Sequence, residues 1–211
     1  MKHQSLITPR GAVPFPVFLS ERIYMREFYK HTGLPDDLAR WQPTIDAMLE
    51  GVDTSGPIYL MIDQGVVRSG QTHRRPGIHI DGYWAAEISA HRGAPPGHRP
   101  SPSPIPPSHR ATPQRHQGNA EGWSNSTFDF PEDIILASNI AACEAYVGEF
   151  NAPIGEMGDC RHISLDTLDR VALEAGRAYA GNVTCLHASL PVAIDTERTL
   201  VRLNIPGWTA H

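Results

Sequence analysis

The sequence predicts one mainly β domain with a few helices, folded as a sandwich or barrel of the jelly-roll kind. Helix signals are confined mostly to the first quarter of the 211-residue chain. Much of the rest consists of short apolar stretches separated by frequent turns, which is typical of β-sandwiches and barrels. The two histidines that most strongly suggest a shared site, His79 and His187, lie far apart in the sequence. A closed β-fold is well suited to bringing such distant segments together.

Composition limits the class of protein. The length suits a single domain with a sizeable core, and 40% of the residues are hydrophobic. The net charge of -5 gives no general reason to expect nucleic-acid binding. Three cysteines without a CxxC spacing argue against both a disulfide framework and a thiolate zinc site. With no apolar run long enough to span a bilayer, we expect a cytoplasmic protein that does not act at a membrane.

The first quarter of the chain contains the helix signals. Pro14 and Pro16 confine residues 13–20 to an edge strand or an extended arm. Residues 21–31 could form a short helix. A better helix begins at Pro35 and stops at Gly51, and we expect it to pack against the outside of a sheet. Its apolar residues recur at helical spacing: Leu38, Trp41, Ile45 and Met48.

The remaining elements are predicted to be strands. Residues 58–67 form a continuous apolar stretch typical of a buried strand, with Gly65 as a bulge. Later strands are expected at residues 134–137, 144–150, 168–173, 179–188 and 199–205. A loop that contains Gly155 and Gly158 separates the second and third of these strands.

Residues 91–120 differ sharply from the rest of the domain. This segment contains eight prolines, four histidines and four arginines, and it has no acidic residue. With so few apolar side chains it cannot form a core, so we expect a flexible Pro-rich insertion within the single domain of residues 1–211. Two interpretations stay open. The insertion could be a passive solvated loop, or a positively charged lid that draws an anionic substrate to a site.

The strongest functional signal is an HxD pair at the end of an apolar stretch. In an extended segment His79 and Asp81 point to the same side, and Ile78 and Ile80 point to the other. His187, on another strand-like stretch, is the best third ligand. Two neutral imidazoles and one carboxylate on one face of an ion leave three octahedral positions open. This is the ligand set of non-haem Fe(II) oxygenases.

Two arginines follow the distal histidine. Arg198 comes eleven positions after His187, and Arg202 comes four positions later on the same face of a predicted strand. Two inward-facing arginines need carboxylate partners, which guanidinium binds in a bidentate manner. The HxD pair, distal histidine and following arginine together resemble the Fe(II)/2-oxoglutarate-dependent dioxygenase superfamily, with a distal spacing similar to its phytanoyl-CoA hydroxylase-like and taurine dioxygenase-like branches.

The resemblance covers roughly residues 58–205 and implies a double-stranded β-helix, a cupin-like jelly roll. It makes His79, Asp81 and His187 the Fe(II) ligands, and Arg198 the partner of the distal carboxylate of 2-oxoglutarate. Arg202 would bind the other end of this co-substrate or an anionic group on the substrate. The implied reaction uses O2 to hydroxylate a small molecule, which could be anionic, and releases succinate and CO2.

Other interpretations remain open at this stage. The same three ligands would serve a cupin-type metalloenzyme that uses no 2-oxoglutarate, and a jelly roll without a metal could be a binding or assembly protein. His79 and Asp81 could also be ordinary turn residues. Four further residues could line a substrate pocket, although aromatic residues near strands are also typical of a core: Tyr83, Trp84, Trp123 and Asn125.

Overall fold

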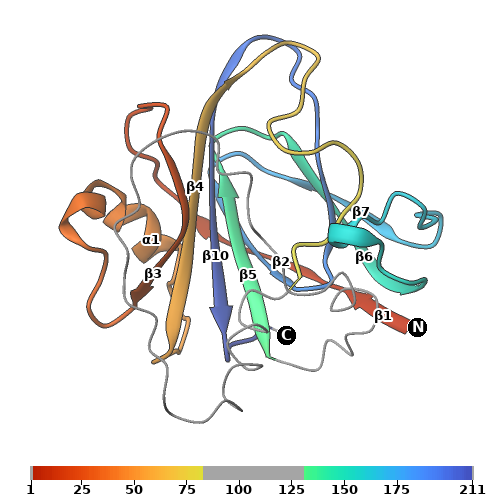
Figure 1. Ribbon diagram of the computed structural model, residues 1–211, viewed down its shortest axis with the longest axis horizontal. Coiled ribbons are helices and arrows are strands. Elements are labelled where there is room, and N and C mark those ends of the chain that lie inside the picture. The colour runs from red at the N-terminus through yellow and green to blue at the C-terminus, as the bar shows by residue number, and fades with distance from the viewer. Residues whose placement is uncertain (1, 83–130, 211) are drawn as a thin grey trace, which may run out of the picture.

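The computed structural model describes residues 2–82 and 131–210, and in this part of the chain it is mainly β, with two antiparallel sheets and one α-helix (Figure 1). The six-stranded sheet has the order β2 (Ile7–Ala12), β8 (Arg177–Asn182), β5 (Glu132–Ser138), β10 (Thr196–Pro206), β4 (Pro57–Val67) and β3 (Arg22–Tyr29). The second sheet is built on β6 (Cys143–Asn151), which pairs with β1 (Lys2–Ser5), β9 (Leu186–Ser189) and β7 (Asp169–Leu173). The predicted mainly β class is therefore confirmed.

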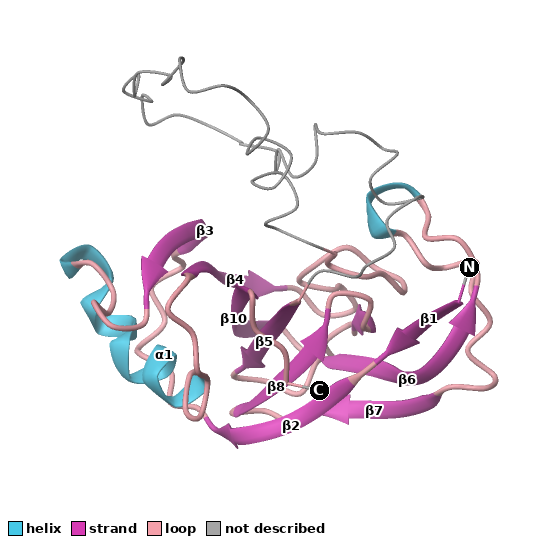
Figure 2. Cartoon of the chain, turned by 90° about the horizontal axis from the view of Figure 1, so that it is seen from below, coloured by secondary structure: helices cyan, strands magenta, loops and turns pink. Residues whose placement is uncertain are grey.

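The main core lies between the six-stranded sheet and the helical segment. The single helix predicted between Pro35 and Gly51 is present as two consecutive pieces, the 3-10 helix η1 (Asp36–Trp41) and then α1 (Gln42–Met48). Figure 2 shows this segment beside β3 and β4, away from β6 and β7. Its buried side chains pack on apolar residues that alternate along the central strands, among them Leu60, Ile62, Val201 and Leu203. Both layers contribute fully buried residues, so this side of the sheet provides most of the packing.

The other face of the same strands is polar where it meets the second sheet. Because side chains alternate along β10, Arg198, Arg202 and Asn204 point away from the helix, and all three are buried. On the neighbouring strand β4, Asp63 is also buried on this face. Burying charged groups is costly unless they are paired, so the space between the sheets is where a functional site is expected.

Two predictions for single elements are wrong. Residues 21–31 are not helical, because β3 occupies most of this segment and pairs with β4 at the sheet edge. A shift in the register of this pair between Ile23 and Arg26 lets both Met25 and Phe28 be buried. Gly65 is not a bulge, since it pairs in regular register with Arg198. A Cβ atom at Gly65 would lie 3.2 Å from His73 Nε2, which accounts for a glycine at this position.

The predicted strand at residues 179–188 is in fact two strands. β8 belongs to the six-stranded sheet and β9 to the other, and a turn closed by the bond from Cys185 N to Asn182 O separates them. The other predicted strands are present within a few residues of their expected bounds. Residues 13–20 contain no regular strand, in agreement with an extended arm. The proposed insertion at residues 91–120 lies outside the described residues.

No helix in the described part of the chain has the length and apolar character needed to cross a membrane.

Candidate active site

The HxD segment is held beside β9 by backbone hydrogen bonds. The amide of His79 donates to His187 O and the amide of His187 donates to His79 O, each over 3.0 Å. On the opposite side of the segment, Ile80 N donates to Gly158 O and Cys160 N donates to Ile78 O. Ile78 and Ile80 pack into a separate apolar cluster. The backbone thus fixes the two histidines as neighbours across a strand pair.

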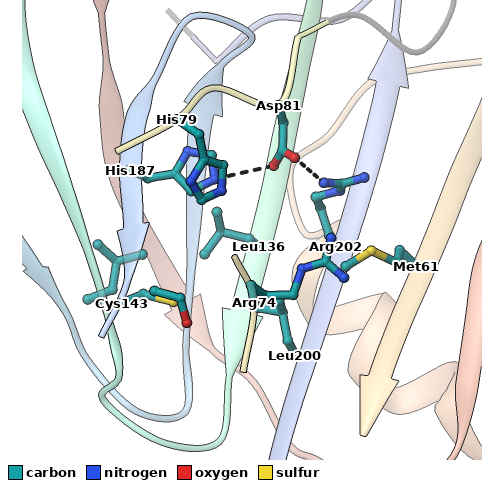
Figure 3. Close-up of a pocket in the computed structure, with 11 residues that line it drawn as sticks. Met61, Arg74, His79, Asp81, Leu136, Cys143, His187, Leu200 and Arg202 are labelled. Atoms are coloured by element: carbon teal, nitrogen blue, oxygen red, sulfur yellow. Dashed lines mark hydrogen bonds and ion pairs between the residues drawn. The ribbon is translucent and has the colours of Figure 1, made fainter. Parts of the chain in front are cut away.

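Both imidazole rings are oriented by backbone carbonyls. His79 Nδ1 lies 2.9 Å from Gly77 O, and His187 Nδ1 lies 2.9 Å from Cys185 O. Because a carbonyl can only accept, each Nδ1 carries the proton and each Nε2 keeps a free lone pair. The ring centroids are 4.4 Å apart (Figure 3). A histidine that binds a metal commonly has this arrangement, with its second nitrogen donating to a carbonyl or carboxylate.

Burial keeps the two imidazoles neutral. The pKa of His79 is lowered to about 3, first by burial and then by the adjacent His187. Burial also lowers the pKa of His187, against the opposing effect of Asp81. Only a neutral imidazole can bind a metal ion, so near neutral pH both rings are in the required state.

The Asp81 carboxylate lies between a histidine and an arginine. Its Oδ2 is 3.5 Å from His187 Nε2, and its Oδ1 accepts a hydrogen bond from Arg202 Nη1 (Figure 3). Within residues 2–82 and 131–210, no three His, Cys, Asp or Glu side chains are already spaced for an ion. Metal binding would therefore require the side chains to adjust. The donor types, two neutral imidazoles and one carboxylate, still suit a divalent ion such as Fe(II).

Arg198 is fully buried and has only neutral partners among the described residues. Its Nη1 donates to Ser189 Oγ over 2.8 Å, its Nη2 lies 2.8 Å from Cys143 Sγ, and its Nε is 3.4 Å from Ser138 Oγ. Burial raises the pKa of Cys143, although Arg198 opposes this, so the thiol is not a counter-ion. A buried guanidinium without a carboxylate is costly, and an anionic ligand would remove that cost.

One cavity connects these groups. His79, His187, Asp81 and Arg202 line part of it, and Cys143 and Ser189 line it next to Arg198. Apolar surface comes from Met61, Leu136, Leu173 and Leu200. The cavity is small, with a volume of about 40 Å³, and it has an open mouth. Polar groups set in mainly apolar walls are typical of a small-molecule site.

The structure brings most of the predicted site residues together. The three predicted metal ligands and Arg202 share the cavity, and Arg198 lies directly behind Cys143 and Ser189. Tyr83, Trp84, Trp123 and Asn125 lie outside the described residues. Sequence reasoning missed Arg74, Cys143 and Ser189 as cavity residues. The signal for Ser189 was available, because it lies two positions after His187 and so shares its face of the strand.

Comparison with known proteins gives no match to any family model, curated sequence or solved structure. The function of this chain is therefore inferred from its own site.

Proposed function

We propose that the protein is a non-haem Fe(II)- and 2-oxoglutarate-dependent oxygenase that hydroxylates a small molecule. The observation that carries this proposal is the pairing of two features, one that lines the cavity and one directly behind its wall. At one place two neutral imidazoles and a carboxylate converge. At another, the buried Arg198 has only neutral partners among the described residues. A 2-oxo diacid has a chelating end suited to the first feature and a distal carboxylate suited to the second.

The order of the strands supports a double-stranded β-helix as the fold of this enzyme. Four strands, β4, β10, β5 and β8, are consecutive neighbours in one sheet. Facing them, the HxD segment lies beside β9, which pairs with β6, which pairs with β7. Along the chain the path crosses repeatedly between the two sheets, which is the pattern of a jelly roll. In such a fold the metal site would lie between the sheets.

Each residue of the site would have its own role. His79, His187 and Asp81 would hold the ion on one side and leave adjacent positions for the co-substrate and O2. When bound, the ion would supply the chemistry by which O2 oxidises 2-oxoglutarate to succinate and CO2 and hydroxylates a substrate C–H bond. Gly77 O and Cys185 O keep both Nε2 atoms available. Apolar walls next to these groups would limit the access of water.

The two arginines would have different roles. Arg202 donates to Asp81 Oδ1, while Oδ2 lies on the side of His187. We assign Arg202 as a positioning residue for a metal ligand, and Arg198 as the main partner of the distal co-substrate carboxylate. Arg202 would then bind neither the co-substrate nor an anionic group on the substrate, the two roles that the sequence left open for it.

Anaerobic visible spectroscopy tests the proposal directly. Purified protein with Fe(II) and 2-oxoglutarate should develop a weak charge-transfer band. The band should be lost in His187→Ala, and Arg198→Ala should need a higher co-substrate concentration. His162→Ala is the matched control, because this exposed histidine contacts Pro153 O and does not line the cavity. Absence of the band, with no iron retained, would refute the assignment.

A second candidate is a cupin-type metalloenzyme that does not use 2-oxoglutarate. The observation in its favour is that Ser189 and Cys143 already occupy both terminal nitrogens of Arg198. In that case an Arg198→Ala protein that still folds should turn over as the wild type does, without added 2-oxoglutarate.

A further inference from the structure

Arg74 lines the cavity but has no part in the function proposed above. It precedes the HxD pair, and Figure 3 shows it among the cavity side chains with Met61 and Arg202. Its Nη1 lies 3.1 Å from Asp63 Oδ2, and about a third of its side chain is exposed. Within the described part of the chain, Asp63 is its one ion-pair partner. No described residue pairs with the other edge of this guanidinium, which is where we place a ligand.

The carboxylate of Asp63 is shared among several cationic or hydrogen-bonding groups. Besides Arg74, it lies 3.0 Å from Arg22 Nε and 3.4 Å from His73 Nε2. Burial acts to raise the pKa of Asp63, but His73, Arg22 and Arg74 together lower it to about 2. The carboxylate is thus fully ionised at neutral pH. One negative charge faces two guanidinium groups, so it does not neutralise Arg74 completely.

The charges around the cavity therefore sum to an excess of positive charge. Among the described residues, Arg74, Arg198 and Arg202 lie at or next to the cavity, and Asp81 offsets Arg202. Asp63 is shared with the exposed Arg22. The two imidazoles are neutral, and a divalent ion would add further positive charge. A bound 2-oxo diacid would satisfy the ion and Arg198 and would leave Arg74 without a full counter-charge.

We propose that Arg74 binds the carboxylate of the substrate, and that this substrate is a small carboxylic acid with an apolar body. The proposal rests on the function proposed above and names its substrate class. A guanidinium is suited to a carboxylate, and Met61 and Leu200 offer apolar surface at the same cavity. Asp63 acts as a positioning residue because it fixes one edge of the Arg74 guanidinium.

Calorimetry with paired ligands tests the proposal. Fe(II)-loaded protein, kept anaerobic and saturated with 2-oxoglutarate, is titrated with straight-chain carboxylic acids and with the matching primary amides. An acid of suitable length should bind, and its amide should bind roughly tenfold more weakly or not at all. Arg74→Gln should lose that preference, and Arg74→Lys should keep part of it.

Arg68→Gln is the matched control. Arg68 pairs with Asp195 and not with Asp63, and its side chain is 69% exposed and does not line the cavity. This variant should bind the acid as the wild type does. The proposal is overturned if the wild type binds no acid, if acid and amide bind equally, or if Arg74→Gln keeps the preference.

The same samples separate this proposal from the function on which it rests. The charge-transfer band of the 2-oxoglutarate complex is recorded before each titration. A normal band with no effect of Arg74→Gln on acid binding rejects the substrate class alone. A missing band in the wild type rejects the oxygenase assignment as well.

Discussion

At the scale of single residues, backbone atoms determine what the side chains of this site can do. The Nδ1 atoms of His79 and His187 each donate to a carbonyl two residues earlier in the chain, Gly77 O and Cys185 O. This local bond selects the tautomer without any further side chain. Burial then keeps both rings neutral. The spacing of His79 and Asp81 in the sequence predicts a shared side, but it does not predict this choice of tautomer.

Removing Arg202 should weaken metal binding. In Arg202→Gln the Asp81 carboxylate loses its charged partner, and we expect the dissociation constant for Fe(II) or Co(II) to rise roughly tenfold, as for other residues that orient metal ligands. Anaerobic titration of the metal measures this, with Arg170→Gln, an exposed arginine on Glu144, as the control. Tighter metal binding in Arg202→Gln would mean that Arg202 competes with the ion instead of positioning its ligand.

Asp63 should make stability depend on pH in the acid range. Its pKa is about 2 in the folded protein against an ordinary 3.8, so its ionised form stabilises the fold by about 2 kcal/mol. This contribution is complete above pH 4 and is lost as the pH falls toward 2. We expect Asp63→Asn to be less stable by about this amount at pH 7, with the difference from wild type shrinking below pH 4. Urea unfolding across this range checks it.

The exposed Asp53→Asn is the control for this comparison, and its stability should stay within about 0.5 kcal/mol of wild type. If Asp63→Asn is as stable as the wild type at pH 7, the ion pairs of Asp63 do not stabilise the fold as we expect.

At the scale of elements, β10 joins the core and the site. Residues on one face pack against the helical segment, and residues on the other carry Arg198 and Arg202. The alternation was readable from the sequence, which is why both arginines were predicted to share a face. Local sequence patterns gave the wrong prediction for β3, a short helix at residues 21–31. Nothing in these residues shows that they will pair with the open edge of β4. Edge pairing is a tertiary effect that local propensity does not contain.

Shortening a buried side chain on the helical face of β10 should destabilise the fold without touching the site. Leu203 is fully buried between the central sheet and the helical segment. We expect Leu203→Ala to lower the free energy of unfolding by about 3 kcal/mol through lost burial and an unfilled cavity. Chemical denaturation measures this, with the exposed Val66→Ala as the control, for which a change within about 0.5 kcal/mol is expected. If both variants lose a similar free energy of unfolding, the buried packing of Leu203 does not have the expected effect on stability.

At the scale of the whole molecule, the mainly β class and most strand positions could be predicted, because apolar alternation and turn residues are local signals. The division of residues 179–188 between two sheets could not, since it depends on how β8 and β9 find different partners. The candidate ligands were predicted from two features of the sequence. One is the HxD spacing of His79 and Asp81, and the other is the number of positions between His187 and Arg198. Arg74 was missed as a cavity residue, because its place depends on Asp63 in a separate strand.

Ligands should stabilise the whole domain. If the site binds metal and 2-oxoglutarate only when folded, each at about a hundred times its dissociation constant, binding should add about 3 kcal/mol per ligand. Differential scanning fluorimetry under nitrogen should show a rise in Tm with Fe(II) and a further rise with 2-oxoglutarate. His187→Ala should show neither. If 2-oxoglutarate raises Tm by itself, in the absence of metal, then it does not need the metal centre in order to bind.

The central position of β10 also determines when this site can exist during protein synthesis. β10 pairs with β4 on one side and with β5 on the other, although both of those strands leave the ribosome well before it. Until it arrives, each has an open edge that could pair wrongly, and both arginines are still missing. His187 is likewise made long after His79. A nascent chain therefore carries only two of the three proposed metal ligands, and the proposed iron site could form only after these later strands have been added.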